Sequence, residues 1–433
     1  MSERSIAALA EVNPPLRRIV RDDDQVSFVS MSDVRESGGI RTSREVSFKS
    51  VKAGFTRFQD GDVLFAKITP CMENGKGALA SGLENGIGCG STEFHVLRAR
   101  PENSSAFVYQ LLQWSVLRQR AELFMSGSAG QQRVPAEFFG RQMVFAPSAA
   151  AQRKIAAILT SLDTAIEKTE ALIEKHQQIK AGLMHDLFTR GVLPNGQLRP
   201  PREQAPELYQ ATPLGWLPRE WNVAKTGDLC SFITKGTTPA RDDMWQGQEG
   251  IRFLRVDNLT FDGQFDFIAS SYRISPRTHT TSLSRSRCVA GDVLMNIVGP
   301  PLGKVAHVTK SVGEVNINQA IAVFRPKAEL SAPFLMRWLT SDSAKRWIGQ
   351  RAKQTSGQLN VTLAMCQDLL IPHMSIDEQQ LIGSRIQCDE GFLQSELARL
   401  AKMRAQKLGV MQDLLTGKVP VTGEAGIAEP TDA

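Results

Sequence analysis

The sequence Met-His-Asp-Leu-Phe-Thr-Arg-Gly-Val at residues 184–192 recurs as Met-Gln-Asp-Leu-Leu-Thr-Gly-Lys-Val at residues 411–419. Outward from this pair, residues 28–192 match residues 253–419 in order, at an offset that stays between 225 and 230. So many matches in one order indicate an internal duplication. The sequence therefore predicts two structural units of the same kind.

The first part of each repeat, residues 28–147 and 253–372, consists of short apolar or alternating runs separated by glycine clusters. One such run, Gly-Asp-Val-Leu at residues 61–64, recurs at residues 291–294. Runs of this length are typical of short strands. Helical periodicity is found within the same units, at residues 107–124 and 332–351. Each unit is therefore predicted to mix helix and sheet, which gives an α+β fold class.

The second part of each repeat predicts a long amphipathic helix, because apolar residues recur near every 3.5 residues without an intervening proline. Two helices of nearly 40 residues would each span roughly 60 Å. We expect them to pack antiparallel as a coiled coil that separates the two globular units. The predicted interface residues are Ile155, Leu162, Leu172, Ile179, Leu183, Ile386, Leu393, Leu397, Leu400 and Leu414.

These patterns predict an order of segments along the chain. Residues 191–220 contain six of the 21 prolines and are expected to form an extended, stiff linker. The predicted segments are a first recognition unit at 1–147, a central long helix at 148–190, the linker at 191–220, a second recognition unit at 213–375, a distal long helix at 376–417 and a flexible tail at 418–433.

Length and composition place the chain among folded globular proteins of two or three domains. It has 433 residues, of which 42% are hydrophobic and 22% charged. No run of 18 apolar residues occurs, and the first residues lack the pattern of a secretion signal, so we expect a cytoplasmic protein without a membrane span. The net charge of +6 is compatible with a nucleic-acid partner.

Motifs for catalysis and metal binding are missing from the sequence. The six cysteines include no Cys-x-x-Cys pair and the six histidines no His-Glu-x-x-His motif, so no metal is expected. Asn-Pro-Pro-Leu at 13–16 resembles a methyltransferase loop that holds a flipped base, but Leu16 replaces the stacking aromatic residue. The Gly-Lys pairs at 75–76 and 303–304 lack the Ser or Thr of a phosphate-binding loop. We therefore expect a chain that is not an enzyme.

Direct reading of DNA bases needs Arg, Lys, Asn or Gln side chains on loops that can enter a groove. The Gly-Lys pairs recur at equivalent positions of the two repeats, which favours lysines that reach DNA phosphates. For each candidate the alternative is a surface or capping role. The candidates are Lys67, Lys76, Gln131, Gln132 and Arg133 in the first unit, and Lys235, Thr237, Arg255, Asn258, Asn296, Lys304, Gln358 and Asn360 in the second.

Several short motifs follow one another along the second repeat in a characteristic order. They are Pro-Leu-Gly-Trp-Leu-Pro-x-x-Trp at 213–221, Gly-Thr-Thr-Pro at 236–239, Ile-Arg-Phe-Leu-Arg-Val-Asp-Asn-Leu at 251–259, Thr-Ser-Gly-Gln at 355–358, Ile-Pro at 371–372, Glu-Gln at 378–379 and Asp-Leu-Leu-Thr-Gly at 413–417. In this order the chain resembles the specificity subunits of type I restriction-modification systems. The resemblance covers most of the chain.

The resemblance implies two target recognition domains, each of which reads one half of a split DNA sequence. It further implies partners: double-stranded DNA, two methyltransferase subunits that bind adenosylmethionine and methylate adenine, and restriction subunits that use ATP and Mg²⁺. On this reading the chain itself binds no cofactor. Arg255 aligns with Ser30, so the two half-targets should differ. The alternatives are a stand-alone bipartite DNA-binding protein and an enzyme with an unrecognised site.

The first repeat departs from this pattern in two places. Only 27 residues precede Phe28, so the first unit is predicted to lack an equivalent of the opening segment that carries Pro-Leu-Gly-Trp and Gly-Thr-Thr-Pro. In addition, Gln152 and Arg153 stand where the second repeat has Glu378, Gln379 and Gln380. The extent of the first unit on its N-terminal side is therefore left open.

Overall fold

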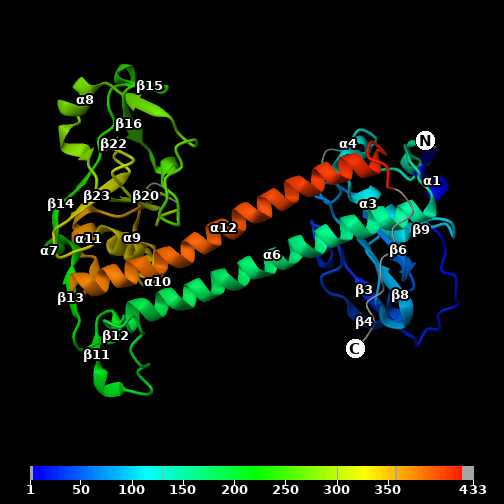
Figure 1. The fold of residues 1–433 in the computed structure, drawn as a ribbon, viewed down its shortest axis with the longest axis horizontal. Coiled ribbons are helices and arrows are strands. Elements are labelled where there is room, and N and C mark those ends of the chain that lie inside the picture. The colour runs from blue at the N-terminus through cyan, green and yellow to red at the C-terminus, as the bar shows by residue number, and fades with distance from the viewer. Residues whose placement is uncertain (1–2, 129, 300, 356–357, 422–433) are drawn as a thin grey trace. The chain divides into compact units, whose positions relative to one another are not determined.

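The computed structural model describes residues 3–128, 130–299, 301–355 and 358–421 (Figure 1). It mixes helix and sheet, as predicted, and divides into two compact units. Unit 1 comprises Met1–Leu172 and Glu396–Ala433, and unit 2 comprises Ile173–Ser395. Within the described residues, no helix combines the length and apolar character needed to cross a membrane.

Unit 1 is built on two four-stranded sheets. The first is antiparallel, in the order β2 (Ala10–Val12), β9 (Phe94–Ala99), β6 (Asp62–Ala66) and β7 (Gly77–Leu79). The second has the order β4 (Arg44–Ser47), β3 (Gln25–Val29), β8 (Ile87–Gly90) and β5 (Thr56–Gln59), with β3 and β8 parallel. Strand β1 (Glu3–Ser5) pairs with β10 (Met143–Phe145). The short helices are α1 (Ile6–Leu9), α2 (Phe48–Val51), α3 (Ser105–Gln113), α4 (Ser115–Glu122) and α5 (Phe138–Arg141).

Unit 2 repeats this plan with additions. Its first sheet has the order β14 (Cys230–Lys235), β23 (Ile321–Pro326), β19 (Val293–Asn296) and β21 (Val305–His307). Its second has the order β15 (Met244–Gln246), β17 (Tyr272–Ile274), β16 (Ile251–Leu254), β22 (Val315–Ile317) and β18 (Arg287–Cys288), with β16 and β22 parallel. Further strands are β11 (Tyr209–Thr212), β12 (Gly215–Pro218), β13 (Asn222–Lys225), β20 (Val298–Gly299), β24 (Lys353–Thr355), β25 (Gln358–Asn360) and β26 (Leu370–His373). The short helices are α7 (Thr226–Leu229), α8 (Pro276–Thr280), α9 (Ala332–Thr340), α10 (Asp342–Arg351) and α11 (Leu363–Asp368).

The duplication begins earlier in unit 1 than the sequence predicts. Strands β1 and β2 flank α1 and pair with β10 and β9, just as β13 and β14 flank α7 and pair with β26 and β23. The expectation that the first unit lacks this opening segment was therefore wrong for the strand–helix–strand part. The match is carried mainly by backbone pairing, with Leu9 and Leu229 as the equivalent buried residues, so a comparison of residues missed it.

An ion pair made by a buried aspartate explains the repeated Gly-Asp-Val-Leu sequence. Gly61 and Gly291 both have positive φ, 87° and 100°, which a turn ahead of the strand requires. The aspartate that follows each glycine is buried and binds an arginine of the neighbouring strand through both carboxylate oxygens. The Asp62–Arg98 distances are 2.7 Å, and the Asp292–Arg325 distances are 2.8 Å.

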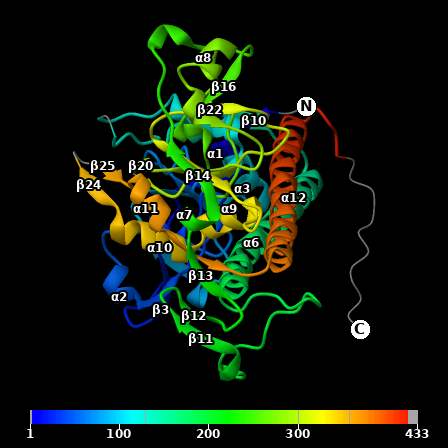
Figure 2. The same cartoon turned by 90° about the vertical axis from the view of Figure 1, so that its left-hand side faces the viewer.

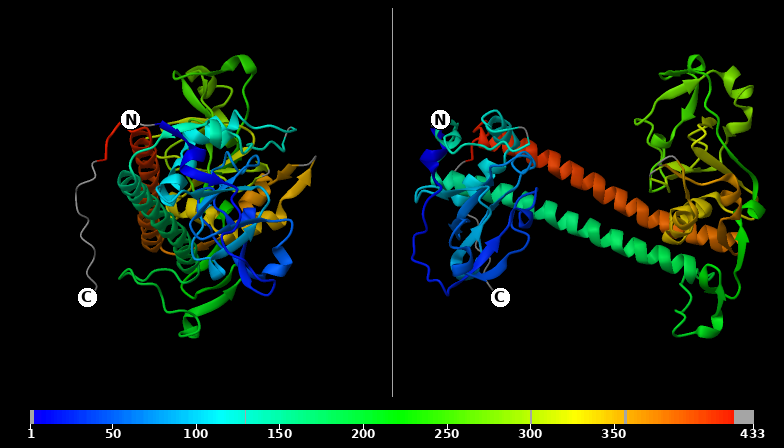
Figure 3. Two further views of the ribbon diagram at one scale, coloured as in Figure 1. Left: turned by 90° about the vertical axis from the view of Figure 1, so that its right-hand side faces the viewer. Right: turned by 180° about the vertical axis from the view of Figure 1, so that it is seen from behind.

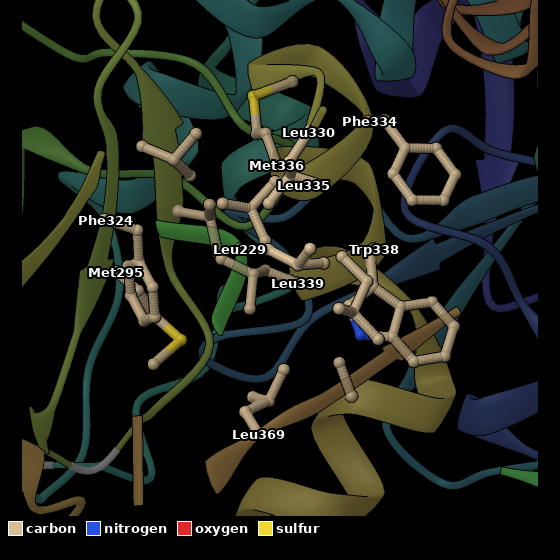
Figure 4. Close-up of a cluster of buried hydrophobic side chains, with 14 of the residues drawn as sticks. Leu229, Met295, Phe324, Leu330, Phe334, Leu335, Met336, Trp338, Leu339 and Leu369 are labelled. Atoms are coloured by element: carbon tan, nitrogen blue, oxygen red, sulfur yellow. The ribbon is translucent and has the colours of Figure 1, made fainter. Parts of the chain in front are cut away.

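The main core of unit 2 lies between its first sheet and helix α9 (Figure 4). Met295 and Phe324 project from the sheet toward Leu335 and Leu339 of the helix, and all four are at most 1% exposed. Trp338 lies beside them and donates its indole N–H to the carbonyl of Leu370 at 3.0 Å. Burial of these large side chains is the main force that holds the helix on the sheet.

Both long helices predicted from periodicity are present. Helix α6 runs from Ala149 to Thr189 and α12 from Ile376 to Leu415. Each begins with a buried glutamine that accepts the N–H of a serine, Ser104 for Gln152 at 3.0 Å and Ser331 for Gln379 at 2.9 Å. This shared contact joins the first turn of each long helix to the globular part of its own unit.

The two helices lie antiparallel within each unit (Figure 1). In unit 1, Glu170 binds Arg404 at 2.7 Å and Asp163 binds Lys407. In unit 2, Lys180 binds Glu390 at 2.8 Å, and the rings of His176 and Phe392 lie 4.2 Å apart. Residues with higher numbers in α6 contact residues with lower numbers in α12, so the two helices run in opposite directions.

The side chains that form the seam of α6 differ in part from those predicted. One row of buried and half-buried side chains follows strict steps of four and three residues along the helix: Ile155, Leu159, Leu162, Ile166, Thr169, Ile173, His176, Lys180, Leu183 and Leu187. Predicted residues Leu172 and Ile179 lie one position off this repeat and are 37% and 48% exposed. Leu397 of α12 is likewise 38% exposed. Of the other predicted residues, Ile155, Ile386, Leu400 and Leu414 are buried, and Leu162, Leu183 and Leu393 are half-buried.

The proline-rich stretch 191–220 is folded, which corrects its prediction as an extended linker. Strands β11 and β12 form a hairpin at the end of unit 2 opposite α8 (Figure 2). Glu378, in the first turn of α12, accepts the indole N–H of Trp221 at 3.0 Å and forms a buried ion pair with Arg199. The last residue of the motif at 213–221 and the Glu-Gln pair at 378–379, far apart in sequence, are therefore joined in one contact.

Candidate nucleic-acid interface

Equivalent loops of the two units gather some of the predicted DNA-contact residues. In unit 1, Arg133 bridges to both Ile68 and Ser126. In unit 2, Asn360 pairs with both Val298 and Lys353, at offsets of 227 to 230 from the first set. A hairpin in each unit therefore lies against the loop that follows the central strand β6 or β19. In unit 2 this hairpin, β24–β25, projects from the body of the unit (Figures 2 and 3).

In unit 1 the structure brings Lys67, Gln131 and Arg133 together. The carbonyl of Lys67 accepts the N–H of Val134 at 2.8 Å, and Arg133 donates to the carbonyl of Gln131 at 3.0 Å. Arg133 also binds the carboxylate of Glu93 through two nitrogens, at 2.8 and 2.9 Å. This hydrogen bond, opposed by partial burial, holds the pKa of Glu93 below its usual range. Arg133 would have to exchange Glu93 for a phosphate or base in order to contact DNA.

Lys76 and Lys304 make equivalent hydrogen bonds to backbone carbonyls in the two units. The ammonium group of Lys76 donates to the carbonyl of Met31 at 2.9 Å, and that of Lys304 to the carbonyl of Val256 at 3.4 Å. Both carbonyls belong to the loop that follows a strand of the second sheet. The two lysines were predicted to reach DNA phosphates, whereas these contacts tie two loops of the surface together.

Asn258 and Asn296 are buried, and we do not propose them as DNA contacts. The Asn258 amide group donates to the carbonyls of Asp266 and Ser270, both at 2.8 Å. Its oxygen accepts the N–H of Arg255 at 2.9 Å. Asn296 likewise accepts the N–H of Lys304 at 2.8 Å. Buried polar groups need such partners, so these side chains hold the loops in shape.

The other candidates of unit 2 are more accessible. Lys235 and Arg255 are exposed, and the Arg255 guanidinium lies 5.3 Å from the ring centre of Tyr272. Thr237 is half-buried and its N–H donates to the carbonyl of Ile317. Asn360 is half-buried in β25. The side chain of Gln358 and the neighbouring residues 356–357 lie outside the described residues.

Two arginines of this surface were missed by the sequence reasoning. Arg252 and Arg273 lie directly opposite each other on β16 and β17, next to Arg255. Arg252 falls inside the quoted motif at 251–259, but nothing in the linear sequence pairs it with Arg273. That pairing depends on the sheet register, which only the folded chain reveals.

The residues considered for catalysis have structural contacts. Asn13, of the Asn-Pro-Pro-Leu sequence, has a φ of 52°, accepts the N–H of Val96 at 3.0 Å and lies 3.1 Å from the ring of His95. Burial lowers the pKa of His95, whose other ring nitrogen lies 2.8 Å from the carbonyl of Val134. In the described part of the chain, no three His, Cys, Asp or Glu side chains are placed to hold a metal ion.

Comparisons with known proteins agree on one family. Residues 19–176 match the family model of the type I restriction modification DNA specificity domain. The chain is 36% identical over 191 residues to the type I restriction enzyme EcoAI specificity subunit and 33% identical over 195 residues to the EcoEI subunit, both from Escherichia coli. Each match covers 42% of this chain, which spans only 32% of the length of each relative. The putative MjaX specificity subunit of Methanocaldococcus jannaschii is 22% identical over 83% of this chain and 79% of its own length.

Solved structures show the same fold. One, from work on complex assembly and conformational transition of the type I R-M system, has a TM-score of 0.57 at 17% identity and covers 96% of this chain and 98% of its own. The type I restriction-modification system S subunit from M. genitalium has a TM-score of 0.56 at 14% identity, with 96% of both chains covered.

Proposed function

Because this chain is a relative of the specificity subunits of type I restriction-modification systems, we propose that it selects the DNA sequence on which such a system acts. The observation that carries the proposal is the duplicated unit: one strand topology occurs twice, with different side chains on equivalent loops. Arg255 stands where unit 1 has Ser30, and Asn360 where it has Arg133. Each unit is then a target recognition domain that reads one half of a bipartite, asymmetric target.

The chemistry is assigned to partner subunits. Two methyltransferase subunits with adenosylmethionine would methylate adenine in double-stranded DNA, and restriction subunits with ATP and Mg²⁺ would cleave it. This chain would bind none of these cofactors itself. The proposal is supported by the structural use of Asn13 and His95 described above, which leaves these residues to shape a loop.

The long helices would set the distance between the half-targets and dock the methyltransferase subunits. Their antiparallel contacts within each unit support a coiled-coil spacer. Ile158, Leu172 and Ile179 of α6 are exposed and lie at multiples of seven residues, hence on one face of the helix. An exposed apolar stripe of this kind suits a partner protein.

The test is a genome-wide map of N6-methyladenine in the source cell with and without this gene. Loss of one bipartite, asymmetric motif on deletion is expected, and return of that motif on re-expression is the control. An unchanged set of methylated motifs in a strain that carries active methyltransferase subunits would overturn the proposal. A chain that instead binds a bipartite site tightly without any methylation would be a stand-alone DNA-binding protein.

A further inference from the structure

Two arginines face each other across the second sheet of unit 2. Arg252 of β16 and Arg273 of β17 are direct partners in an antiparallel pair, so their side chains lie on the same face. Like charges in this position destabilise a sheet. Burial, and then the charge of Arg252, lowers the pKa of Arg273. Two adjacent positive charges in the protein without DNA favour the binding of an anion between them.

The described residues supply neither arginine with a carboxylate partner at ion-pair distance. Arg252 donates to the carbonyl of Val312 at 3.3 Å, and Arg273 to the carbonyl of Gly247 at 3.1 Å. These backbone contacts orient the two guanidinium groups without neutralising them. The remaining N–H groups of both side chains are therefore available to a ligand.

Both arginines line a pocket of about 180 Å³. Its wall includes Phe267, whose ring centre lies 4.6 Å from the Arg252 guanidinium, and Tyr272. Ser270 also lines it, and the Ser270 hydroxyl is buried without a hydrogen-bond partner among the described residues. An unpaired buried hydroxyl beside two arginines offers a further donor to the same anion.

We propose that Arg252, Arg273 and Ser270 form a phosphate site, which holds one phosphate of the DNA backbone against unit 2. Planar guanidinium groups match the geometry of phosphate oxygens, and a phosphodiester would relieve the repulsion between the two arginines. Arg255 lies three residues after Arg252, just beyond the end of β16, and belongs to the candidate DNA surface. A phosphate held here would position the duplex for base reading by neighbouring loops. This inference rests on the proposed function.

The site is particular to unit 2. In unit 1 the equivalent cross-strand pair, on β3 and β4, is Ser27 with Glu45, which carries the opposite charge. The two recognition units should therefore hold the backbone differently. Phosphate contacts at the two halves of the target would not be related by symmetry.

The test measures DNA affinity against salt concentration for the full-length chain with its co-purifying partners. Each phosphate contact contributes about 0.9 to the slope of log K against log salt. The double variant Arg252→Gln, Arg273→Gln should reduce the slope by about 0.9, and each single variant should reduce it by no more than that, because the two arginines share one phosphate. Arg202→Gln is the matched control, since Arg202 stacks on Trp216 at 4.6 Å but lies in the 191–220 segment. Unchanged slopes with intact DNA binding would overturn the phosphate site and leave the proposed function standing.

A second measurement separates a binding role from a structural one. Without DNA, Arg273→Gln should melt at the same or a higher temperature than the unaltered chain, because a like-charge contact is removed. A lower melting temperature together with weaker DNA binding would identify the arginines as structural and overturn the proposal. The same would follow if the less disruptive Arg273→Lys variant also lowered the melting temperature.

Inorganic phosphate distinguishes the source of the anion. Phosphate at millimolar concentration should raise the melting temperature of the unaltered chain but not of the double variant, and DNA should compete with it. A phosphate response with normal salt slopes would mean that the pocket takes free phosphate and not the DNA backbone, against the proposal. If the unaltered assembly binds no DNA at all, the proposed function fails together with this inference.

Discussion

Arg98 and Arg325 make the same bidentate contact in the two units but differ in access to water. The Arg98 side chain is 6% exposed and that of Arg325 is 37% exposed, while both partner aspartates are 1% exposed. Water is therefore nearly absent from the first ion pair and reaches the second. Equivalent residues of a duplicated fold need not contribute equally to its stability.

We expect Arg98→Ala to destabilise the chain more than Arg325→Ala. Removal of Arg98 leaves the Asp62 carboxylate buried without its partner, at a cost of about 3–5 kcal/mol. The cost for Arg325 should be about 1–2 kcal/mol, because water can replace part of the lost hydrogen bonds. Urea unfolding with hydrogen exchange resolved to each unit measures both values. Equal costs would contradict this reasoning.

One buried histidine, His95, and one half-buried histidine, His307, predict sensitivity to acid. Burial lowers the pKa of His95 in unit 1 and of His307 in unit 2 below the usual 6.5. Below that pH the unfolded chain takes up protons that the folded chain resists, so stability falls as pH falls. His95→Gln should melt lower than the unaltered chain at about pH 7.5 but lose less on transfer to about pH 5.5. His185→Gln, at an exposed position, should show the full acid sensitivity; equal sensitivity of all three proteins would refute the assignment.

Among the secondary-structure elements, α6 shows that the positions buried in a strict heptad repeat differ from those predicted by the spacing of apolar residues. Its seam includes the half-buried Lys180, a charged residue that an apolar pattern passes over. Lys180 is held there by Glu390, which also binds Arg337 of α9. The helix therefore buries polar side chains where its partner provides a matching group. Neighbouring apolar residues such as Leu172 and Ile179 remain on the outside.

Lengthening both helices by one heptad should lengthen the gap in the DNA target. Seven residues inserted after Lys175 and seven after Gln394 preserve the four-and-three spacing and add about 10.5 Å. This is about three base pairs of the DNA axis. Methylation mapping should show the same half-targets with a longer gap. A four-residue insertion in α6 alone is the contrasting variant, because it breaks the four-and-three spacing of the seam. An unchanged gap in the variant with one heptad added to each helix would reject the spacer role.

For the whole molecule, the proposed function requires two units that read DNA separately. Arg255 is exposed on unit 2 and aligns with Ser30 in unit 1. Arg255→Ala should therefore change the half of the motif read by unit 2 and leave the other half intact, at about 1–3 kcal/mol for a base contact. Methylation mapping of the variant measures this directly. Relaxed selection at both halves would indicate a general loss of structure.

The sequence alone determined the duplication, the mixed α and β units and the two long helices, because residue identity and local periodicity carry that information. Only the tertiary structure decided which side chains meet: Lys76 with a backbone carbonyl, Glu378 with Trp221, Arg252 with Arg273. It also decided that residues 3–12 repeat the pairing of residues 222–235 although the two segments share little sequence beyond Leu9 and Leu229. Such contacts depend on strand register and on burial, which join residues far apart in the chain and leave no periodic pattern within it.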